Sequence, residues 1–335
     1  MATVITNLLS AIPIFGQDIV ELKNVTEFFS SYPLRGEATI TTLLPTIGTV
    51  SHHALKKGKK LRIDKKEYLS IPYQFVAFLA GFIDGDGYFQ ITKTTKGFIT
   101  IKLKIVLQLE DRSTLEYILS TLKLGKLDIY RDYKNPICRL TINRTDLQEV
   151  ILPLILHHGI FFLTEARRAQ FDLAMFIFKN DIKLFDKINF NTLPCHLMQD
   201  NKKNLNIPTV FILPKTALDY VNLPFFKNWL VGFTTAEGSF LIKSNNDGCF
   251  QLKQKIHTQL FEAFKLIFYT NRKIFIEQNK FNQFSVSSKN DIQSVINFFS
   301  FSGFHPLIGL KCIQYLNWLS NLKNSKRYSN LKFPQ

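Results

Sequence analysis

The chain has 335 residues, 46% of them hydrophobic, which is enough apolar material for a packed core and excludes a mainly disordered protein. Its 42 Lys and Arg residues outnumber its 26 Asp and Glu residues, and the formal charge of +16 favours a polyanionic partner such as nucleic acid or an anionic membrane, between which charge alone does not choose. No apolar run approaches the roughly 20 residues that span a bilayer, so we expect no membrane partner.

The first 70 residues contain no copy of any later segment. Residues 1–22 lack the basic segment of a secretory signal and the Arg-rich face of a transit peptide. Residues 23–70 form a basic extension, in which the tract HHALKKGKKLRIDKK is expected to be a solvated charged segment. A specific nucleic-acid contact at this tract is the alternative.

Residues 71–183 are expected to form a unit of helix, two-strand hairpin, helix, second hairpin and helix. Pro72 stands where the first helix begins, and Gly87 follows its last apolar-periodic residue, where a left-handed C-cap is expected. The following hairpin turns at a Lys-Gly pair. Its second strand alternates apolar residues with polar ones, so one face should meet the core and the other should be cationic and amide-rich. The apolar positions are Ile101, Leu103, Ile105 and Leu107.

Residues 184–218 hold three prolines and no sustained period, and are expected to be a linker. Residues 219–325 then repeat the first unit, because FVAFLAGFIDGDGYFQI returns as FKNWLVGFTTAEGSFLI. Two later pairs match in the same order, RTDLQEVI with KNDIQSVI and EARRAQF with GLKCIQY. Ordered matches at a nearly constant offset indicate a duplicated unit. Residues 326–335 remain as a C-terminal tail.

The duplication gives each motif one equivalent acid, Asp86 and Glu237. If the motif helices pack side by side, with Gly81 facing Gly232 to allow close approach, these acids meet at one helix end beside carbonyl groups of the last turns. An all-oxygen pocket at the negative ends of two helices favours Mg²⁺, with Mn²⁺ as a substitute. Cations held there beneath a cationic sheet suit phosphodiester hydrolysis.

Other polar residues are predicted to act near the two acids. Arg167 and Lys311 occupy equivalent positions, and would stabilise developing negative charge or orient water. Gln254 ends a strand of the second unit and would position that water. Its counterpart in the first unit cannot be assigned, because Gln108 has the opposite strand parity. Asp84 aligns with a threonine, so capping or local hydrogen bonding is expected of it rather than catalysis; a plain turn is the alternative for the DGDG segment alone.

LAGFIDGDG (79–87) and LVGFTTAEG (230–238) resemble the paired motif of the LAGLIDADG homing endonucleases. The resemblance spans about residues 71–325. It implies an α+β fold of two αββαββα units related by a pseudo-twofold axis, with saddle-shaped antiparallel sheets over the DNA major groove. It also implies a monomer that cuts double-stranded DNA at a long pseudo-palindromic site.

The same resemblance assigns roles to particular residues. It implies that Asp86 and Glu237 are the catalytic and metal-binding acids. The carbonyl groups of Gly85 and Ala236 are the other metal contacts that it implies.

A β-ribbon that reads a major groove needs polar side chains alternating along one face. Counting in steps of two from each acid, and adding the polar face of the second strand, predicts a set of DNA contacts. Its lysines would bind phosphates, and its amides and hydroxyls would select bases. A structural role is the alternative for any one member of the set, which comprises Gln90, Thr92, Thr94, Lys96, Lys102, Lys104, Lys243 and Asn245.

Residues 2–22 resemble a piece of cytochrome b. This implies an intron reading frame continuous with an upstream exon in a mitochondrial genome, with the product in the matrix and residues 1–22 outside the endonuclease fold. The rival function is an RNA maturase that binds its own group I intron RNA. Retention of both acids favours the nuclease, because RNA binding does not require them; a transcription factor derived from the fold should have lost one.

Overall fold

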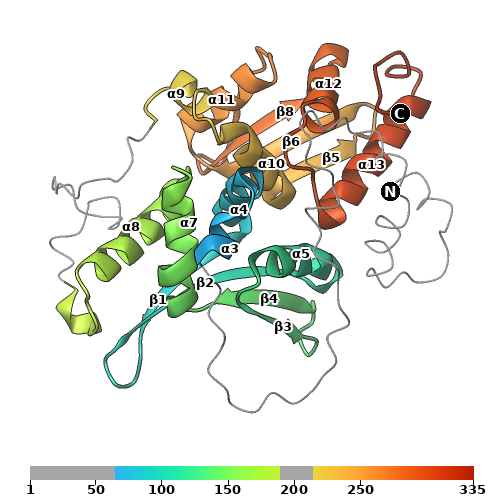
Figure 1. Cartoon of the computed structure of the whole chain (residues 1–335). Coiled ribbons are helices and arrows are strands. Elements are labelled where there is room, and N and C mark those ends of the chain that lie inside the picture. The colour runs from blue at the N-terminus through green and yellow to red at the C-terminus, as the bar shows by residue number, and fades with distance from the viewer. Residues whose placement is uncertain (1–64, 189–213) are drawn as a thin grey trace. The chain divides into compact units, whose positions relative to one another are not determined.

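The structure is a computed structural model that describes residues 65–188 and 214–335 (Figure 1). The exon-like segment, nearly all of the basic extension and the middle of the linker lie outside the described residues. The chain divides into two units, residues 1–70 with 334–335 and residues 71–333. The first contributes the short helix α3 (Lys65–Leu69). No helix among the described residues is long and apolar enough to cross a membrane.

The second unit contains two copies of one arrangement of helices and strands. Each copy holds a four-stranded antiparallel sheet, in the order β1-β2-β4-β3 or β5-β6-β8-β7. The first copy, repeat 1, comprises α4 (Tyr73–Asp86), β1 (Gly87–Lys93), β2 (Ile99–Gln108), η2 (Leu109–Asp111), α5 (Arg112–Leu122), β3 (Lys126–Tyr130), β4 (Ile137–Ile142), α6 (Arg144–Asp146), η3 (Leu147–Ile151), α7 (Leu152–His157), α8 (Glu165–Lys179) and η4 (Phe185–Lys187).

Repeat 2 follows the same order, so the predicted α+β fold is confirmed. Both repeats carry a helical stretch after the second hairpin, α6–α7 and α12–η7, that the predicted order of elements lacked. Repeat 2 comprises α9 (Ala217–Val221), α10 (Phe226–Glu237), β5 (Gly238–Ile242), β6 (Gly248–Lys255), α11 (Thr258–Ile267), β7 (Phe275–Glu277), β8 (Phe281–Val286), α12 (Lys289–Ile296), η7 (Asn297–Phe301) and α13 (Gly309–Asn324).

The motif helices α4 and α10 pack directly against each other (Figure 1). A Cβ atom at Gly81 would overlap the carbonyl oxygen of Trp229, and a Cβ atom at Gly232 would overlap that of Phe78. The facing atoms belong to backbone, which cannot rotate away, so only glycine permits this approach. The predicted contact of the two motif helices at Gly81 and Gly232 is therefore confirmed, and it brings the two helix ends together.

The sheet of repeat 1 has the two faces that the alternation predicted. Ile101, Leu103 and Ile105 on β2 are no more than 1% exposed, whereas the residues between them are partly exposed. Burying each such side chain contributes roughly 1.5–3 kcal/mol to folding. The buried face anchors the sheet to the core and leaves the polar face free for a ligand.

Some local expectations were wrong. Gly87 does not form a left-handed C-cap: its φ of −89° is extended, because the chain enters β1 directly, and a Cβ there would crowd Ile83. The steps-of-two count also ran past the strands. β1 ends at Lys93 and β5 at Ile242, so half of the predicted DNA contacts are exposed turn residues; these are Thr94, Lys96, Lys243 and Asn245.

The two ends of the expected linker have ordered structure. Leu184 forms an isolated bridge to Phe98, and the Phe185 N–H donates to the Gly97 carbonyl at 2.9 Å. At the other end, α9 begins at Ala217 with a capping box made by Thr216. Both ends of the expected linker are therefore ordered parts of the repeats that they adjoin.

Candidate active site

The structure brings Asp86 and Glu237 together. Asp86 is the last residue of α4, and Glu237 is the last residue of α10. The two helix ends are in contact, because a Cβ atom at Gly85 would overlap the side chain of Ala236 and lie 3.1 Å from Cγ of Glu237. Each acid directly precedes the first strand of its sheet, so the pair lies where both sheets begin.

Burial and mutual repulsion both act on these acids. Burial, followed by the charges of Glu237 and Asp111, raises the pKa of Asp86 to about 7. Burial also raises the pKa of Glu237, although the Nε2 of Gln254 donates to its Oε1 at 2.9 Å and opposes the shift. Two half-buried carboxylates that resist ionisation side by side form a site where a cation would be stabilising.

The predicted basic residues lie beside the acids. Arg167, near the start of α8, donates from Nε to the Ile83 carbonyl at 3.1 Å, one turn before Asp86. Lys311, near the start of α13, donates to the carbonyl of Gly238, the residue after Glu237. Burial lowers the pKa of both basic groups, and the charges of nearby carboxylates, Asp86 and Glu237 among them, oppose the shift.

Two glutamines that the sequence reasoning missed hold these basic groups. Gln170 Oε1 accepts from Nη1 of Arg167 at 3.1 Å and from the Phe89 backbone N–H at 3.0 Å. Gln314 Oε1 accepts from Nζ of Lys311 at 3.2 Å. A signal was present, because both glutamines stand at the same position of the aligned segments EARRAQF and GLKCIQY.

Strand register identifies the counterpart of Gln254. Gly87 pairs with Ile105 in repeat 1, and Gly238 pairs with Leu252 in repeat 2. Two residues further along each strand stand Leu107 and Gln254, so a leucine occupies the first-repeat position. Within residues 65–188 and 214–335, no hydrogen bond reaches the Asp86 carboxylate, whereas Glu237 has its amide donor. The two halves of the site are therefore chemically unequal.

Asp84 has a structural hydrogen-bonding role, as expected, but its partners are distant in sequence rather than local. Its Oδ2 accepts from the Leu163 N–H and from Nε1 of Trp229, both at 2.7 Å. Its Oδ1 accepts from the N–H and hydroxyl of Thr164. Burial raises its pKa to about 6, and these bonds oppose the rise. Asp84 thus ties α4 both to the start of α8 and to α10.

The donor set at the helix ends fits a hard divalent cation. Asp86 and Glu237 offer carboxylate oxygens, and the carbonyl groups of Gly85 and Ala236 belong to last turns, where backbone acceptors lack partners in the helix. Among the described residues, no group of three or more His, Cys, Asp and Glu side chains is placed to hold a metal. A metal here would therefore depend on these two acids together with backbone, water or substrate oxygens.

Four predicted DNA contacts share the polar face of the repeat 1 sheet. Gln90 pairs with Lys102, and Lys104 pairs with Tyr88, so their side chains project on the same side as Thr92. Arg139, which was not predicted, lies on this face through the pairing of β4 with β2. Lys102, Lys104 and Arg139 thus share one face, and burial, followed by repulsion from Arg139 and Lys102, lowers the pKa of Lys104.

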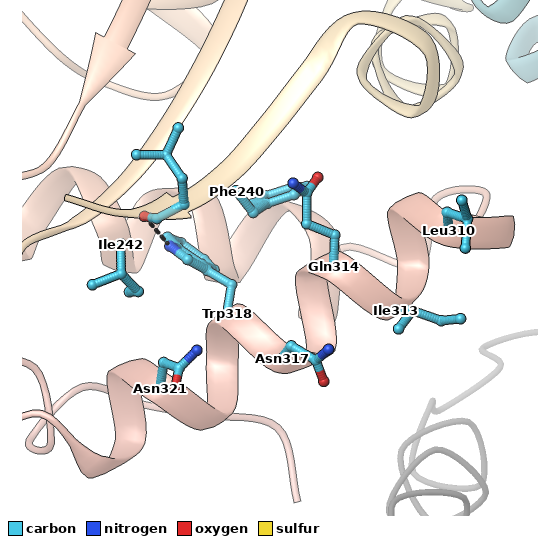
Figure 2. Close-up of a pocket in the computed structure, with 9 residues that line it drawn as sticks. Phe240, Ile242, Leu310, Ile313, Gln314, Asn317, Trp318 and Asn321 are labelled. Atoms are coloured by element: carbon cyan, nitrogen blue, oxygen red, sulfur yellow. Dashed lines mark hydrogen bonds between the residues drawn. The ribbon is translucent and has the colours of Figure 1, made fainter. Parts of the chain in front are cut away.

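A separate pocket of about 350 Å³ lies between α13 and β5 (Figure 2). Trp318 forms part of its wall, with Nε1 donating to the Leu241 carbonyl at 3.2 Å. Its other lining residues are apolar or carry amides, and none is charged. The pocket therefore offers no acidic or basic side chain, unlike the site of Asp86 and Glu237.

Comparisons with known proteins agree with the resemblance to LAGLIDADG endonucleases. The LAGLIDADG endonuclease family model matches residues 79–162. The chain is 24% identical over 277 residues to a probable intron-encoded endonuclease, Cox1-I1b, of Schizosaccharomyces pombe, covering 77% of this chain and 67% of that protein. These matches confirm the resemblance that the two motifs predicted.

Solved structures share the fold. The LAGLIDADG meganuclease I-AabMI, bound to uncleaved DNA, matches with a TM-score of 0.52 and 22% identity over 73% of this chain and 89% of that one. I-SmaMI, bound to an uncleaved DNA target in the presence of calcium ions, matches with a TM-score of 0.54 and 20% identity over 74% and 90%. The predicted arrangement of two repeats is thereby confirmed.

Proposed function

We propose that this chain, which is similar to the LAGLIDADG endonucleases and carries the motif twice, is a site-specific endonuclease that cuts both strands of double-stranded DNA. The observation that supports this most is the meeting of Asp86 and Glu237 at the contacting ends of α4 and α10. Two similar structures, I-AabMI and I-SmaMI, are bound to DNA, which also supports a DNA substrate.

The reaction is divalent-metal-dependent hydrolysis, with Mg²⁺ as the metal and Mn²⁺ as a substitute. Asp86 and Glu237 would hold the metal together with the carbonyls of Gly85 and Ala236. When bound, such an ion lowers the pKa of water and neutralises a leaving oxygen. Gln254 fixes the orientation of the Glu237 carboxylate through its hydrogen bond.

Arg167 and Lys311 stabilise the negative charge that develops on the phosphate. Among the described residues, two of the three N–H donors of the Lys311 ammonium bond Gly238 and Gln314. The third N–H is left for a substrate oxygen. The side chain is thus held in one place before substrate arrives. Preorganised donors of this kind need little reorganisation during the reaction.

DNA lies on the polar faces of the two sheets. Lys102 and Lys104 bind phosphates, and Gln90 and Thr92 reach base edges. Because the repeats carry different side chains on these faces, the target is long and imperfectly palindromic. Because both motifs belong to one chain, a monomer suffices.

The gene is an intron reading frame, and the host gene is cytochrome b. An intron origin is supported by the printed name of the relative Cox1-I1b. The cytochrome b assignment is supported by the sequence of residues 2–22. Expression then takes place in the mitochondrial matrix.

Purified protein should linearise a plasmid that carries joined cytochrome b exons when Mg²⁺ is present, and should bind without cutting when Ca²⁺ replaces it. Asp86→Asn and Glu237→Gln should both abolish cutting while retaining DNA binding. Cleavage of a pool of randomised duplexes, tested in parallel, reveals the preferred sequence if the target does not lie in the cytochrome b exons. Equal cutting by wild type and both variants would refute the mechanism.

If the protein cuts neither the exon plasmid nor the randomised duplexes, binding of intron RNA by the same preparations should be measured. Tight binding of the cytochrome b intron RNA, together with no DNA cleavage by the wild type, would favour the maturase function over the endonuclease function. Binding of that RNA by the Asp86→Asn variant at wild-type affinity would show that the acids are not needed for it.

A further inference from the structure

The helix that carries Lys311 has no cap of its own. The N-cap residue of α13 is Ile308, whose side chain cannot accept a hydrogen bond. The first N–H groups of a helix need acceptors, which a polar N-cap side chain usually supplies. Here the acceptor comes from the other repeat, because Oδ1 of Asp111 accepts from the Leu310 N–H at 3.0 Å. An acid of repeat 1 thus caps a helix of repeat 2.

The surroundings of this cap are shaped for close approach. Gly309 has a φ of +59°, and a Cβ atom at that position would overlap both Oγ1 of Thr114 and Oδ1 of Asp111. Thr114 is fully buried and donates its hydroxyl to the same Oδ1 at 2.7 Å. A glycine, a buried hydroxyl and a carboxylate therefore fit together at the start of α13.

Repeat 1 meets the same need in another way. The start of α8, which carries Arg167, is held by Asp84 through the N–H groups of Leu163 and Thr164. The counterpart of Asp84 in repeat 2 is Thr235, whose hydroxyl bonds the Val231 carbonyl of its own helix at 2.9 Å. The Thr235 hydroxyl is thus directed to its own helix, and no hydrogen bond joins it to α13 among the described residues.

We propose that Asp111 is a positioning residue that holds Lys311 in the active site, as Asp84 does for Arg167. The residue that Asp111 bonds, Leu310, directly precedes Lys311, so loss of the cap frees the first turn that carries the ammonium group. The carboxylate also attracts the Lys311 ammonium. Its effect on catalysis rests on the proposed DNA cleavage, whereas its effect on Lys311 does not.

Amine labelling of the metal-free full chain, followed by mass spectrometry, tests the position of Lys311 directly. Asp111→Ala should raise the labelling rate of Lys311 several-fold and leave that of Lys253 unchanged. Asp111→Asn keeps an oxygen that can accept from Leu310, and should restore most of the protection. Ser288→Ala is the matched control, because Ser288 caps α12 through the Asp291 N–H. It should lower Tm without changing the labelling of Lys311.

Cleavage kinetics provide the second readout. Asp111→Ala should lower kcat roughly 10- to 100-fold with little change in KM, since misplaced catalytic groups have effects of this size. Unchanged Lys311 labelling in Asp111→Ala would overturn the proposal, as would a kcat equal to that of Ser288→Ala. Increased labelling without DNA cleavage by the wild type would support the positioning role and overturn the proposed function.

Discussion

Replacing Gly81 or Gly232 with alanine should separate the motif helices. Each new Cβ would overlap a backbone carbonyl of the facing helix, Trp229 in one case and Phe78 in the other. Overpacking of a core costs about 1–3 kcal/mol, and a rigid backbone neighbour places this case near the upper end. Alanine regains about 1 kcal/mol of helix propensity. The expected net loss is therefore about 2 kcal/mol for each variant.

The double variant gives a sharper test. Once the helices have moved apart for one alanine, the second alanine has more room. The stability loss of the double variant should therefore be smaller than the sum of the two single losses by about 1 kcal/mol. Guanidinium unfolding of the two single variants and the double variant measures this coupling. Cleavage should fall about 100-fold in each single variant, because a shift of about 1 Å separates Asp86 from Glu237.

Gly303→Ala is the control for conformational effects. Gly303 has a φ of +71° and no atom within 4 Å of an added Cβ, so its cost of about 1–2 kcal/mol is purely conformational. This variant should cleave normally. Wild-type stability in both Gly81→Ala and Gly232→Ala would refute the close contact of α4 and α10, and with it the shared site.

Gln254→Leu, which copies Leu107 of repeat 1, should reduce cleavage roughly 10- to 100-fold, the usual effect of losing a hydrogen bond to a metal-holding carboxylate; unchanged kcat in strand-resolved assays would contradict this role. Lys104→Ala should reduce the slope of log affinity against log salt by about one unit, measured by DNA binding in Ca²⁺, if the lysine contacts a phosphate. His305 is 7% exposed, and burial lowers its pKa to about 4 while its ring bonds Tyr117 and Pro306. Because the unfolded chain binds the proton more tightly, the free energy of unfolding should fall as pH drops from 6.5 to 4, by at most about 3 kcal/mol; a His305→Gln variant with the same pH profile would refute this.

Much of the site was predictable because duplication reveals equivalent positions. Asp86 and Glu237 align between the motifs, and their convergence requires only that two glycine-bearing helices pack together. The alternation along residues 99–108 likewise predicted which face of the sheet is buried. These features depend on local spacing and symmetry, which a single sequence contains.

The rest depended on long-range contacts or on departures from symmetry. Asp111 is the N-cap residue of α5, where α11 has His257, and it bonds a residue 199 positions away, so neither the repeat nor the local sequence indicated its role. Leu107 was not identified as the counterpart of Gln254, because that equivalence follows from strand register rather than from residue type. The Lys96-Gly97 turn was predicted, but the strand ends at Lys93 and Ile242 were missed, because side-chain parity alone does not fix the residue at which a strand ends.

Calcium binding by calorimetry, on protein bound to its selected DNA duplex, tests most directly whether the repeats share one cation site. Asp86→Asn, Glu237→Gln and the double variant should all lose the shared binding event, with the double variant losing no more binding free energy than either single variant. Additive losses, with each single variant retaining an independent site of wild-type affinity, would contradict a site built from one acid of each repeat.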